Sequence, residues 1–169
     1  MFIELSDRAK AANNANADLF VSFHNNAAAN TGARGVETYV YHGKDSTLAK
    51  NIQESVVNSG IFTANRGVKS ADFAVVRETR MLSALVELGF ITNKDDAHLL
   101  MTKTDSIAMA VANGILKTLG MQLLQEKKPE TVVNKSGISD SAKEASLKAV
   151  KAGIMADGDG DGHIDNPKD

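Results

Sequence analysis

The stretches Asp18-Leu-Phe-Val-Ser-Phe-His24 and Met81-Leu-Ser-Ala-Leu-Val-Glu87 decide the fold that the sequence predicts. Each is a short apolar run that stops on a polar residue able to take part in chemistry. Runs this short and this apolar are typical of strands buried on both faces, as in a parallel sheet covered by helices. Because ligands gather outside the carboxyl ends of such strands, we expect His24 and Glu87 to face one shared pocket.

A histidine beside a carboxylate at the rim of a sheet indicates a metal ligand and a general base. Each residue also has a structural interpretation. His24 at a strand end fits a packed or hydrogen-bonded residue, and Glu87 fits a carboxylate paired with Arg77 or Arg80. The spacing of these residues leaves both interpretations open.

The composition describes an ordinary globular protein without affinity for nucleic acid. The chain has 169 residues, 43% of them hydrophobic and 24% charged, with a formal net charge of -2. This length suits one main domain with a smaller appendage. Cysteine is absent, so a zinc site has to use histidines and carboxylates. Neither a membrane span nor a signal-peptide pattern occurs, so action outside the cytoplasm would require lysis or a separate export route.

Alternating strand and helix patterns predict an α/β fold with a mostly parallel sheet flanked by helices. We expect strands at 18–24, 35–41, 73–77 and 81–87, with a loop at 61–72. We expect helices at 4–16, from Asp45 or Ser46 to Gly60, after Thr92 or Asn93, and from Asp105 to Gly120. A lysine-rich linker at 122–136 separates the domain at 1–121 from a small helical tail at 137–169.

Several stretches together resemble the zinc-dependent N-acetylmuramoyl-L-alanine amidases, peptidoglycan hydrolases of bacteria and their phages. They occur in the family's order and spacing from residue 1 to about 120. The stretches are Leu5-Ser-Asp-Arg-Ala-Lys-Ala-Ala-Asn13, Ala17-Asp-Leu-Phe-Val-Ser-Phe-His-Asn-Asn-Ala27, Gly35-Val-Glu-Thr-Tyr39, Arg66-Gly-Val-Lys69 and Ala84-Leu-Val-Glu-Leu-Gly-Phe-Ile-Thr-Asn93.

The resemblance implies cleavage of the amide between N-acetylmuramic acid and the L-alanine of the stem peptide, at the bacterial cell wall. It implies Zn²⁺ held by two histidines and a glutamate, with a second glutamate as general base. His24 matches the later histidine ligand, and Glu87 matches the base. Glu37 either shapes the site or faces solvent, while Arg66 and Arg77 are candidates for binding stem-peptide carboxylates.

The family's first histidine, its glutamate ligand and its opening strand lie upstream of the segment where this chain begins. The sequence therefore resembles an amidase truncated at its N-terminus. His42, His98 and His163 do not stand at the matching place. The competing hypothesis is an inactive lysin fragment that binds cell wall or complements an upstream fragment. The exposed sheet edge also predicts self-association.

The C-terminal tail resembles the first half of a calcium loop. The oxygen ligands would be the carboxylates of Asp157, Asp159, Asp161 and Asp165. Lys168 stands where a bidentate glutamate is expected, so the pattern fits weak Ca²⁺ binding or a solvated acidic turn. The tail also resembles the opening of an S-layer-homology-like repeat, which implies a secondary cell-wall polymer as a partner.

Overall fold

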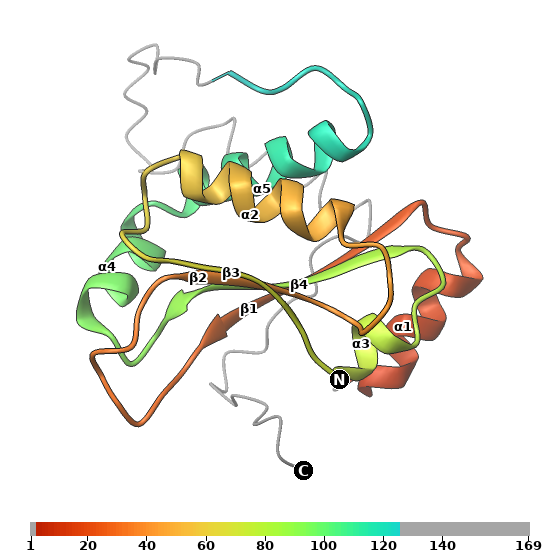
Figure 1. The fold of residues 1–169 in the computed structure, drawn as a ribbon, viewed down its shortest axis with the longest axis horizontal. Helices are drawn as coiled ribbons and strands as arrows, with labels where there is room; N and C mark the ends of the chain where they lie inside the picture. Colours follow the sequence, from red (N-terminus) through yellow and green to blue (C-terminus); the bar gives the residue numbers. More distant parts are fainter. Residues whose placement is uncertain (1–2, 126–169) are drawn as a thin grey trace, which may run out of the picture. The chain divides into compact units, whose positions relative to one another are not determined.

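The computed structural model describes residues 3–125, which form an α/β domain around one mixed sheet (Figure 1). The strand order across the described sheet is β1-β4-β2-β3. The strands are β1 (Leu19–Asn26), β2 (Val36–Val40), β3 (Asn65–Ser70) and β4 (Leu82–Phe90). Strands that are distant in sequence therefore lie side by side at the centre of the sheet.

The strand directions divide the sheet into two parallel pairs that run in opposite directions. β1 is parallel to β4 and β2 is parallel to β3, whereas β2 and β4 are antiparallel. Because of this reversal, the beginning of β2 lies beside the carboxyl-terminal half of β4, and Glu37 is the register partner of Glu87. The sheet is thus mostly parallel, as predicted, with one reversal that positions these two carboxylates.

Helices cover both faces of the sheet. The helices are α1 (Leu5–Asn14), α2 (Thr47–Asn58), α3 (Ala74–Arg77), α4 (Lys94–Thr102) and α5 (Thr104–Thr118). α2 and α5 pack on one face, whereas α1 and α3 lie on the other (Figure 1). α4 follows the end of β4, and the Asn93 side chain caps it by accepting bonds from the backbone N–H groups of Asp95 and Asp96, as predicted.

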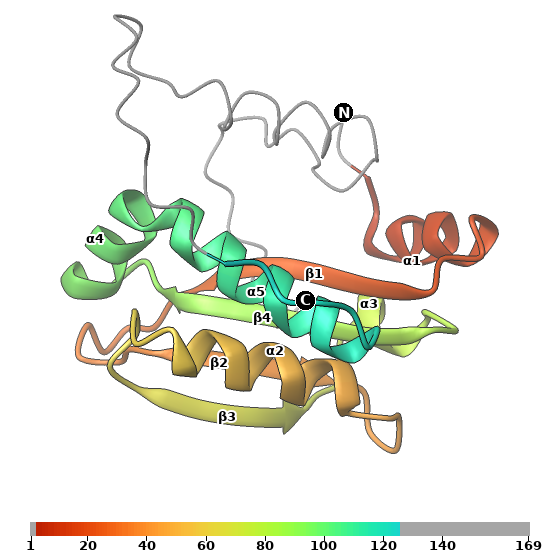
Figure 2. The same cartoon turned by 90° about the horizontal axis from the view of Figure 1, so that it is seen from above.

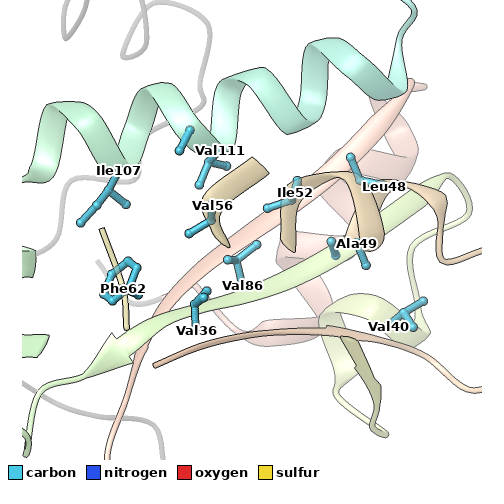
Figure 3. Packing of buried hydrophobic residues seen from close by; sticks show 12 residues of the cluster. Val36, Val40, Leu48, Ala49, Ile52, Val56, Phe62, Val86, Ile107 and Val111 are labelled. Atoms are coloured by element: carbon cyan, nitrogen blue, oxygen red, sulfur yellow. The ribbon is translucent and has the colours of Figure 1, made fainter. Parts of the chain in front are cut away.

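The main core lies between α2, α5 and the sheet (Figure 3). The apolar stripe of α2, formed by Leu48, Ile52 and Val56, is fully buried there. Gly114 lets the two helices approach closely, because a Cβ at this position would lie 2.5 Å from the Cα of Ile52. α2 and α5 therefore form a fixed layer behind β4.

Two sequence predictions are wrong. The expected loop at 61–72 contains the strand β3, and the expected strand at 73–77 is the short helix α3. β3 has a polar sequence, because it is an edge strand with exposed ends. α3 looks strand-like because Val75 and Val76 are β-branched, but one helical turn buries both of them against Leu85.

The two strands that were expected to stop at His24 and Glu87 continue further. β1 runs to Asn26 and β4 runs to Phe90. Both side chains therefore lie within the strands, close to their carboxyl ends, and the rigid sheet fixes their backbone.

Residues 126–169 lie outside the described part of the chain. They include most of the predicted linker, the helical tail, His163 and the four aspartates of the calcium-loop pattern. Among the helices that the structure describes, none is long and apolar enough to cross a membrane.

Candidate active site

The site begins with two neighbouring strands that carry His24 and Glu87 in register. β1 and β4 are parallel, and His24 is the register partner of Glu87. Register partners in adjacent strands project from the same face of a sheet, so the two side chains are neighbours. Ser22 lies on the same face, with its Oγ 2.9 Å from Nε2 of His24, at hydrogen-bonding distance.

Glu87 has the properties of a proton carrier. Its Oε2 is buried and has no hydrogen-bond partner among the described residues. Burial, followed by the nearby charge of Glu37, raises the pKa of Glu87 from 4.5 to about 7. The ion pairs with Arg77 or Arg80 that the structural interpretation proposed are not formed, since Arg77 pairs with Asp72 and Glu78 instead. Near neutral pH, both protonation states of Glu87 are therefore populated.

Glu37 is the buried anion beside Glu87. Its side chain is 2% exposed, which resolves the earlier alternative, because Glu37 does not face solvent. Within residues 3–125, four side chains donate hydrogen bonds to its carboxylate. The donors are Asn26 at 2.7 Å, Tyr39 at 2.9 Å, Arg66 at 2.8 Å and the ammonium of Lys69.

These donors decide the protonation state of Glu37. Burial alone would raise the pKa of Glu37, but the hydrogen bonds from Lys69, Arg66 and Tyr39 outweigh it and hold that pKa below 4.5. Burial, together with the negative charge of Glu37, in turn raises the pKa of Tyr39. Glu37 is therefore ionised at neutral pH, and Tyr39 stays protonated.

A β-bulge explains how Arg66 and Lys69 reach the same carboxylate. Residues three apart in a regular strand project to opposite faces. In β3 the register shifts, because Val36 pairs with Asn65 whereas Glu37 pairs with Gly67. Arg66 is thus the extra residue, and Gly67 adopts a φ of +78° that glycine tolerates. Arg66 also lies over the Phe90 ring, with its guanidinium carbon 4.9 Å from the ring centroid.

Asp96 connects the two strands that bear the carboxylates. It is 1% exposed, and its Oδ2 accepts hydrogen bonds from the backbone N–H of Gly35 at 2.8 Å and of Phe90 at 2.9 Å. These residues stand next to the start of β2 and at the end of β4. A Cβ on Gly89 would lie 2.9 Å from the Phe62 ring and 3.2 Å from Asp96 Oδ2. Asp96 therefore fixes the separation between the strands of Glu37 and Glu87.

The structure does not bring Arg77 to this site. Arg77 ends α3, before β4 begins at Leu82, and its guanidinium pairs with Asp72 at 2.6 Å and Glu78 at 3.0 Å. Glu87 lies five residues beyond Leu82 along β4, which corresponds to about 16 Å at the usual rise of a strand. The carbonyl of Val76, next to Arg77, is 3.4 Å from the Ser83 hydroxyl near the start of β4, so Arg77 lies toward the amino-terminal end of that strand.

The remaining histidines of the described chain lie elsewhere. His42 follows the end of β2, which runs from Leu85 toward the amino-terminal half of β4, and its ring packs edge-on against Tyr41. His98 is in α4. Neither is a register neighbour of His24.

The residues at this site do not fit a complete zinc centre. Across residues 3–125, no group of three or more His, Cys, Asp or Glu side chains is arranged to hold a metal ion. A catalytic zinc ion normally has three protein ligands and one open position. His24 by itself falls short of that requirement, so the described residues provide an acid–base group but no closed ligand set.

Sequence reasoning identified His24, Glu87, Glu37 and Arg66 but did not identify the residues that support them. The supporting residues are Asn26, Tyr39, Lys69 and Asp96. Tyr39 and Glu37 are two residues apart in a predicted strand, a spacing that places them on one face. The strand order that brings Asn26, Lys69 and Asp96 to the site has no comparable local signal.

Comparison with known proteins shows the family and the fold of this chain. The sequence pattern of the family described as N-acetylmuramoyl-L-alanine amidase matches residues 1–117. The chain therefore belongs to the N-acetylmuramoyl-L-alanine amidase family. Its α/β fold is that of the solved catalytic domains of this family.

Among the relatives, the endolysin of Bacillus phage SPP1 is 41% identical over 76% of this chain and 48% of its own length. The sporulation-specific N-acetylmuramoyl-L-alanine amidase of Bacillus subtilis is 37% identical over 72% of this chain and 48% of its own length. The solved catalytic domain of CwlV, an amidase from Bacillus (Paenibacillus) polymyxa, matches with a TM-score of 0.67 and 31% identity, over 72% of this chain and 69% of that domain. The chain thus spans about half the length of the phage endolysin and of the sporulation-specific amidase.

Proposed function

We propose that this chain carries the acid–base half of a peptidoglycan amidase site. The reaction is hydrolysis of the amide between the lactyl group of N-acetylmuramic acid and the L-alanine of the stem peptide. The observation that carries the proposal is the pair formed by His24 and Glu87, in register on adjacent strands, with Oε2 of Glu87 buried and unpartnered. Membership of the amidase family supports the choice of substrate.

Glu87 performs both proton transfers in this proposal. In its ionised form, Oε2 accepts a proton from the water that attacks the amide carbonyl carbon. When the carbon–nitrogen bond breaks, the protonated carboxyl returns that proton to the departing alanine nitrogen. A pKa of about 7 suits both steps, because each form is then accessible near neutral pH.

His24 remains our proposed zinc ligand, with the other ligands supplied from outside residues 3–125. Arg66 remains a proposed contact for the carboxylates of the substrate. We assign Glu37 the role of holding the Arg66 side chain in place, because Nε of Arg66 donates to the Glu37 carboxylate at 2.8 Å. Arg77 would have to meet a distant part of the stem peptide. Binding of Ca²⁺ or wall polymer by the tail stays a prediction from the sequence.

One observation favours a second candidate function. Because the described residues hold no three-ligand cluster, the chain alone would be an inactive subunit that binds cell wall or complements a polypeptide bearing the missing ligands. The two functions differ in whether hydrolysis and tight zinc binding belong to the chain alone.

The test is to incubate the purified chain with cell walls and measure newly released L-alanyl amino groups. The Glu87→Gln variant removes the base and should reduce hydrolysis by about 10²–10⁴-fold. Glu54→Gln is the matched control, because Glu54 lies on α2 and pairs with Lys117 at the surface. Equal activity in the wild type and Glu87→Gln would refute the role of Glu87.

Zinc content after dialysis separates the two candidates. A 1:1 zinc ratio in the wild type, lost in His24→Ala and kept in Glu87→Gln, supports the enzyme. Zinc retention that appears only after mixing with an upstream amidase polypeptide supports the complementing subunit. Zinc that stays bound in His24→Ala would refute His24 as a ligand.

A further inference from the structure

Arg66 uses one part of its guanidinium group within the described residues. Its Nε donates to Oε2 of Glu37 at 2.8 Å, whereas neither terminal nitrogen has a hydrogen-bond or ion-pair partner within residues 3–125. The side chain is 36% exposed. A guanidinium presents its donors as a planar fork, which binds a carboxylate through two parallel hydrogen bonds. The edge formed by the two terminal nitrogens can therefore bind an external carboxylate.

The Glu37 carboxylate does not need that second edge, because its own oxygens are saturated. Its Oε1 accepts hydrogen bonds from Asn26 and Tyr39, and its Oε2 accepts from Arg66 and Lys69. Two cations thus share one anion, so this cluster carries a surplus of positive charge. A surplus of positive charge beside the site attracts an anionic group of the substrate.

Arg66 belongs to the outer strand β3, yet its guanidinium reaches the centre of the sheet. Figure 2 shows β2 between β3 and β4. The guanidinium carbon lies 4.9 Å from the centroid of the Phe90 ring, at the end of β4. Glu87 pairs with His24, and Phe90 pairs with Asn26 across a register shift. His24 and Asn26 are two residues apart and project from one face, which places Phe90 about 7 Å from Glu87 along the strands.

We propose that the terminal nitrogens of Arg66 bind a carboxylate on the second residue of the stem peptide, so that the site prefers a free acid there over its carboxamide. This inference rests on the amidase function proposed above, which places the attacked carbonyl beside Glu87. The second residue of the stem lies about 7 Å from that carbonyl, which is the usual span of two extended residues. The span matches the separation between Glu87 and Phe90. A carboxamide fits the fork poorly, because it carries no charge and its nitrogen donates.

The neighbouring cation, Lys69, does not offer the same contact. Its ammonium donates to Glu37 and is a compact point charge without a planar fork. Arg66 is held at two points, by the Glu37 carboxylate and by the face of the Phe90 ring. A side chain that is already held loses little conformational entropy when it binds a ligand. The discrimination between acid and amide is therefore assigned to Arg66.

The first test compares two dipeptides by NMR titration of the wild-type chain. L-alanyl-D-isoglutamate carries the free carboxylate, and L-alanyl-D-isoglutamine carries a carboxamide in its place. The acid should bind at least about tenfold more tightly, because the amide loses the charge-assisted hydrogen bonds. Equal affinity for the two peptides, or no binding of either at millimolar concentrations, would overturn the proposal. This comparison does not require any variant to fold.

The second test assigns the preference to Arg66. Arg66→Lys keeps the positive charge but removes the fork, and should reduce the preference to about twofold or less. Arg80→Lys is the matched control and should keep the full preference, because Arg80 is exposed and precedes β4, at the opposite end of that strand from Phe90. Partial unfolding of a variant lowers both affinities and leaves their ratio unchanged. A preference that persists in Arg66→Lys, or that falls equally in Arg80→Lys, would refute the role of Arg66.

The titrations depend neither on hydrolysis nor on zinc, so this inference and the amidase function can fail separately. A wild type that hydrolyses cell walls but binds both peptides equally would refute the inference and leave the amidase function standing. A preference for the acid without hydrolysis would support the inference and count against activity of the chain alone.

Discussion

Glu37 and Glu87 are register partners on neighbouring strands, yet the sheet gives them opposite environments. On the side of β2 and β3, the Glu37 carboxylate is surrounded by donors, two of them cationic. On the side of β1 and β4, Oε2 of Glu87 is buried without a donor among the described residues. The same functional group is therefore a fixed anion in one strand and a titratable acid in the next.

Glu37 and Glu87 are coupled through charge. The cations of β3 keep Glu37 ionised, and that fixed negative charge, added to burial, holds the proton on Glu87 up to about pH 7. A carboxylate with saturated hydrogen bonds cannot accept another proton readily. The division of labour is thus built by the strand order, which places a cation-bearing edge strand next to β2 and not next to β4.

The largest loss of stability is expected from removing the charge of Glu37, the carboxylate whose hydrogen bonds are saturated. Glu37→Gln removes the buried anion and leaves Arg66 and Lys69 around a neutral amide. Breaking a buried ion pair typically costs about 3–5 kcal/mol, and we expect the lower end of that range here, because Arg66 and Lys69 are each partly exposed and solvent compensates them in part. Urea unfolding at neutral pH should show this loss in the free energy of unfolding. Glu54→Gln removes an exposed carboxylate and serves as the control. Equal stability of the two variants would mean that the ion cluster contributes little.

The second effect is the pH dependence of stability that arises from Glu87, whose Oε2 has no donor among the described residues. Between pH 4.5 and about 7 the folded chain keeps the Glu87 proton, whereas an unfolded chain releases it. The folded state binds more protons there, so the contribution of Glu87 to stability is present below pH 4.5 and is lost as the pH rises through about 7. A pKa raised from 4.5 to about 7 corresponds to a loss of about 3 kcal/mol.

Glu87→Gln isolates this contribution, because glutamine does not titrate. The variant should gain stability relative to the wild type as the pH rises from 5 to 8, measured by urea unfolding at each pH. Glu37 contributes in the opposite direction, since its lowered pKa gives stability that is lost as the pH falls below 4.5. A pH-independent difference between Glu87→Gln and the wild type would argue against the raised pKa of Glu87.

The sequence predicted β1, β2, β4 and the long helices but not the edge strand β3. The runs at 18–24 and 81–87 are apolar enough to indicate buried strands, and helix periodicity located α2 and α5. β3 was missed because an exposed edge strand needs no apolar alternation, and its sequence of Asn, Arg, Gly and Lys is typical of loops. α3 was missed because a buried helical turn and a short strand have similar composition.

The partners of the site could be predicted only in part. His24 and Glu87 were identified because each follows an apolar run, and the family resemblance named the same two residues. The burial of Glu37 depends on β2 being antiparallel to β4, and local sequence does not encode the direction of a neighbouring strand. Lys69 depends further on the bulge at Arg66, which aligns it with Glu37.

A smaller loss of stability is expected from removing one of the two cations that pair with Glu37. Lys69→Met removes one of the two cations of Glu37 while keeping much of the side-chain volume. Lys69 is 38% exposed and Arg66 remains in place, so we expect a loss of about 1 kcal/mol. Lys117→Met is matched to it, since Lys117 pairs with the exposed Glu54 and should change stability less. If Lys69→Met costs as much as Glu37→Gln, Lys69 rather than the pair of cations holds the site together.

The smallest effect should come from Arg77. Its ion pairs with Asp72 and Glu78 are at the surface, where solvent screens them, and it stands at the far end of β4 from Glu87. Arg77→Ala should therefore leave the free energy of unfolding and the pKa of Glu87 unchanged, as followed by urea unfolding and by NMR titration of the glutamate carboxyl carbons. The pKa of Glu87 responds to the nearby charge of Glu37. A change in that pKa in Arg77→Ala would show that more distant charges along β4 also influence Glu87, and the difference between the two carboxylates could then not be attributed to the cations of β3 alone.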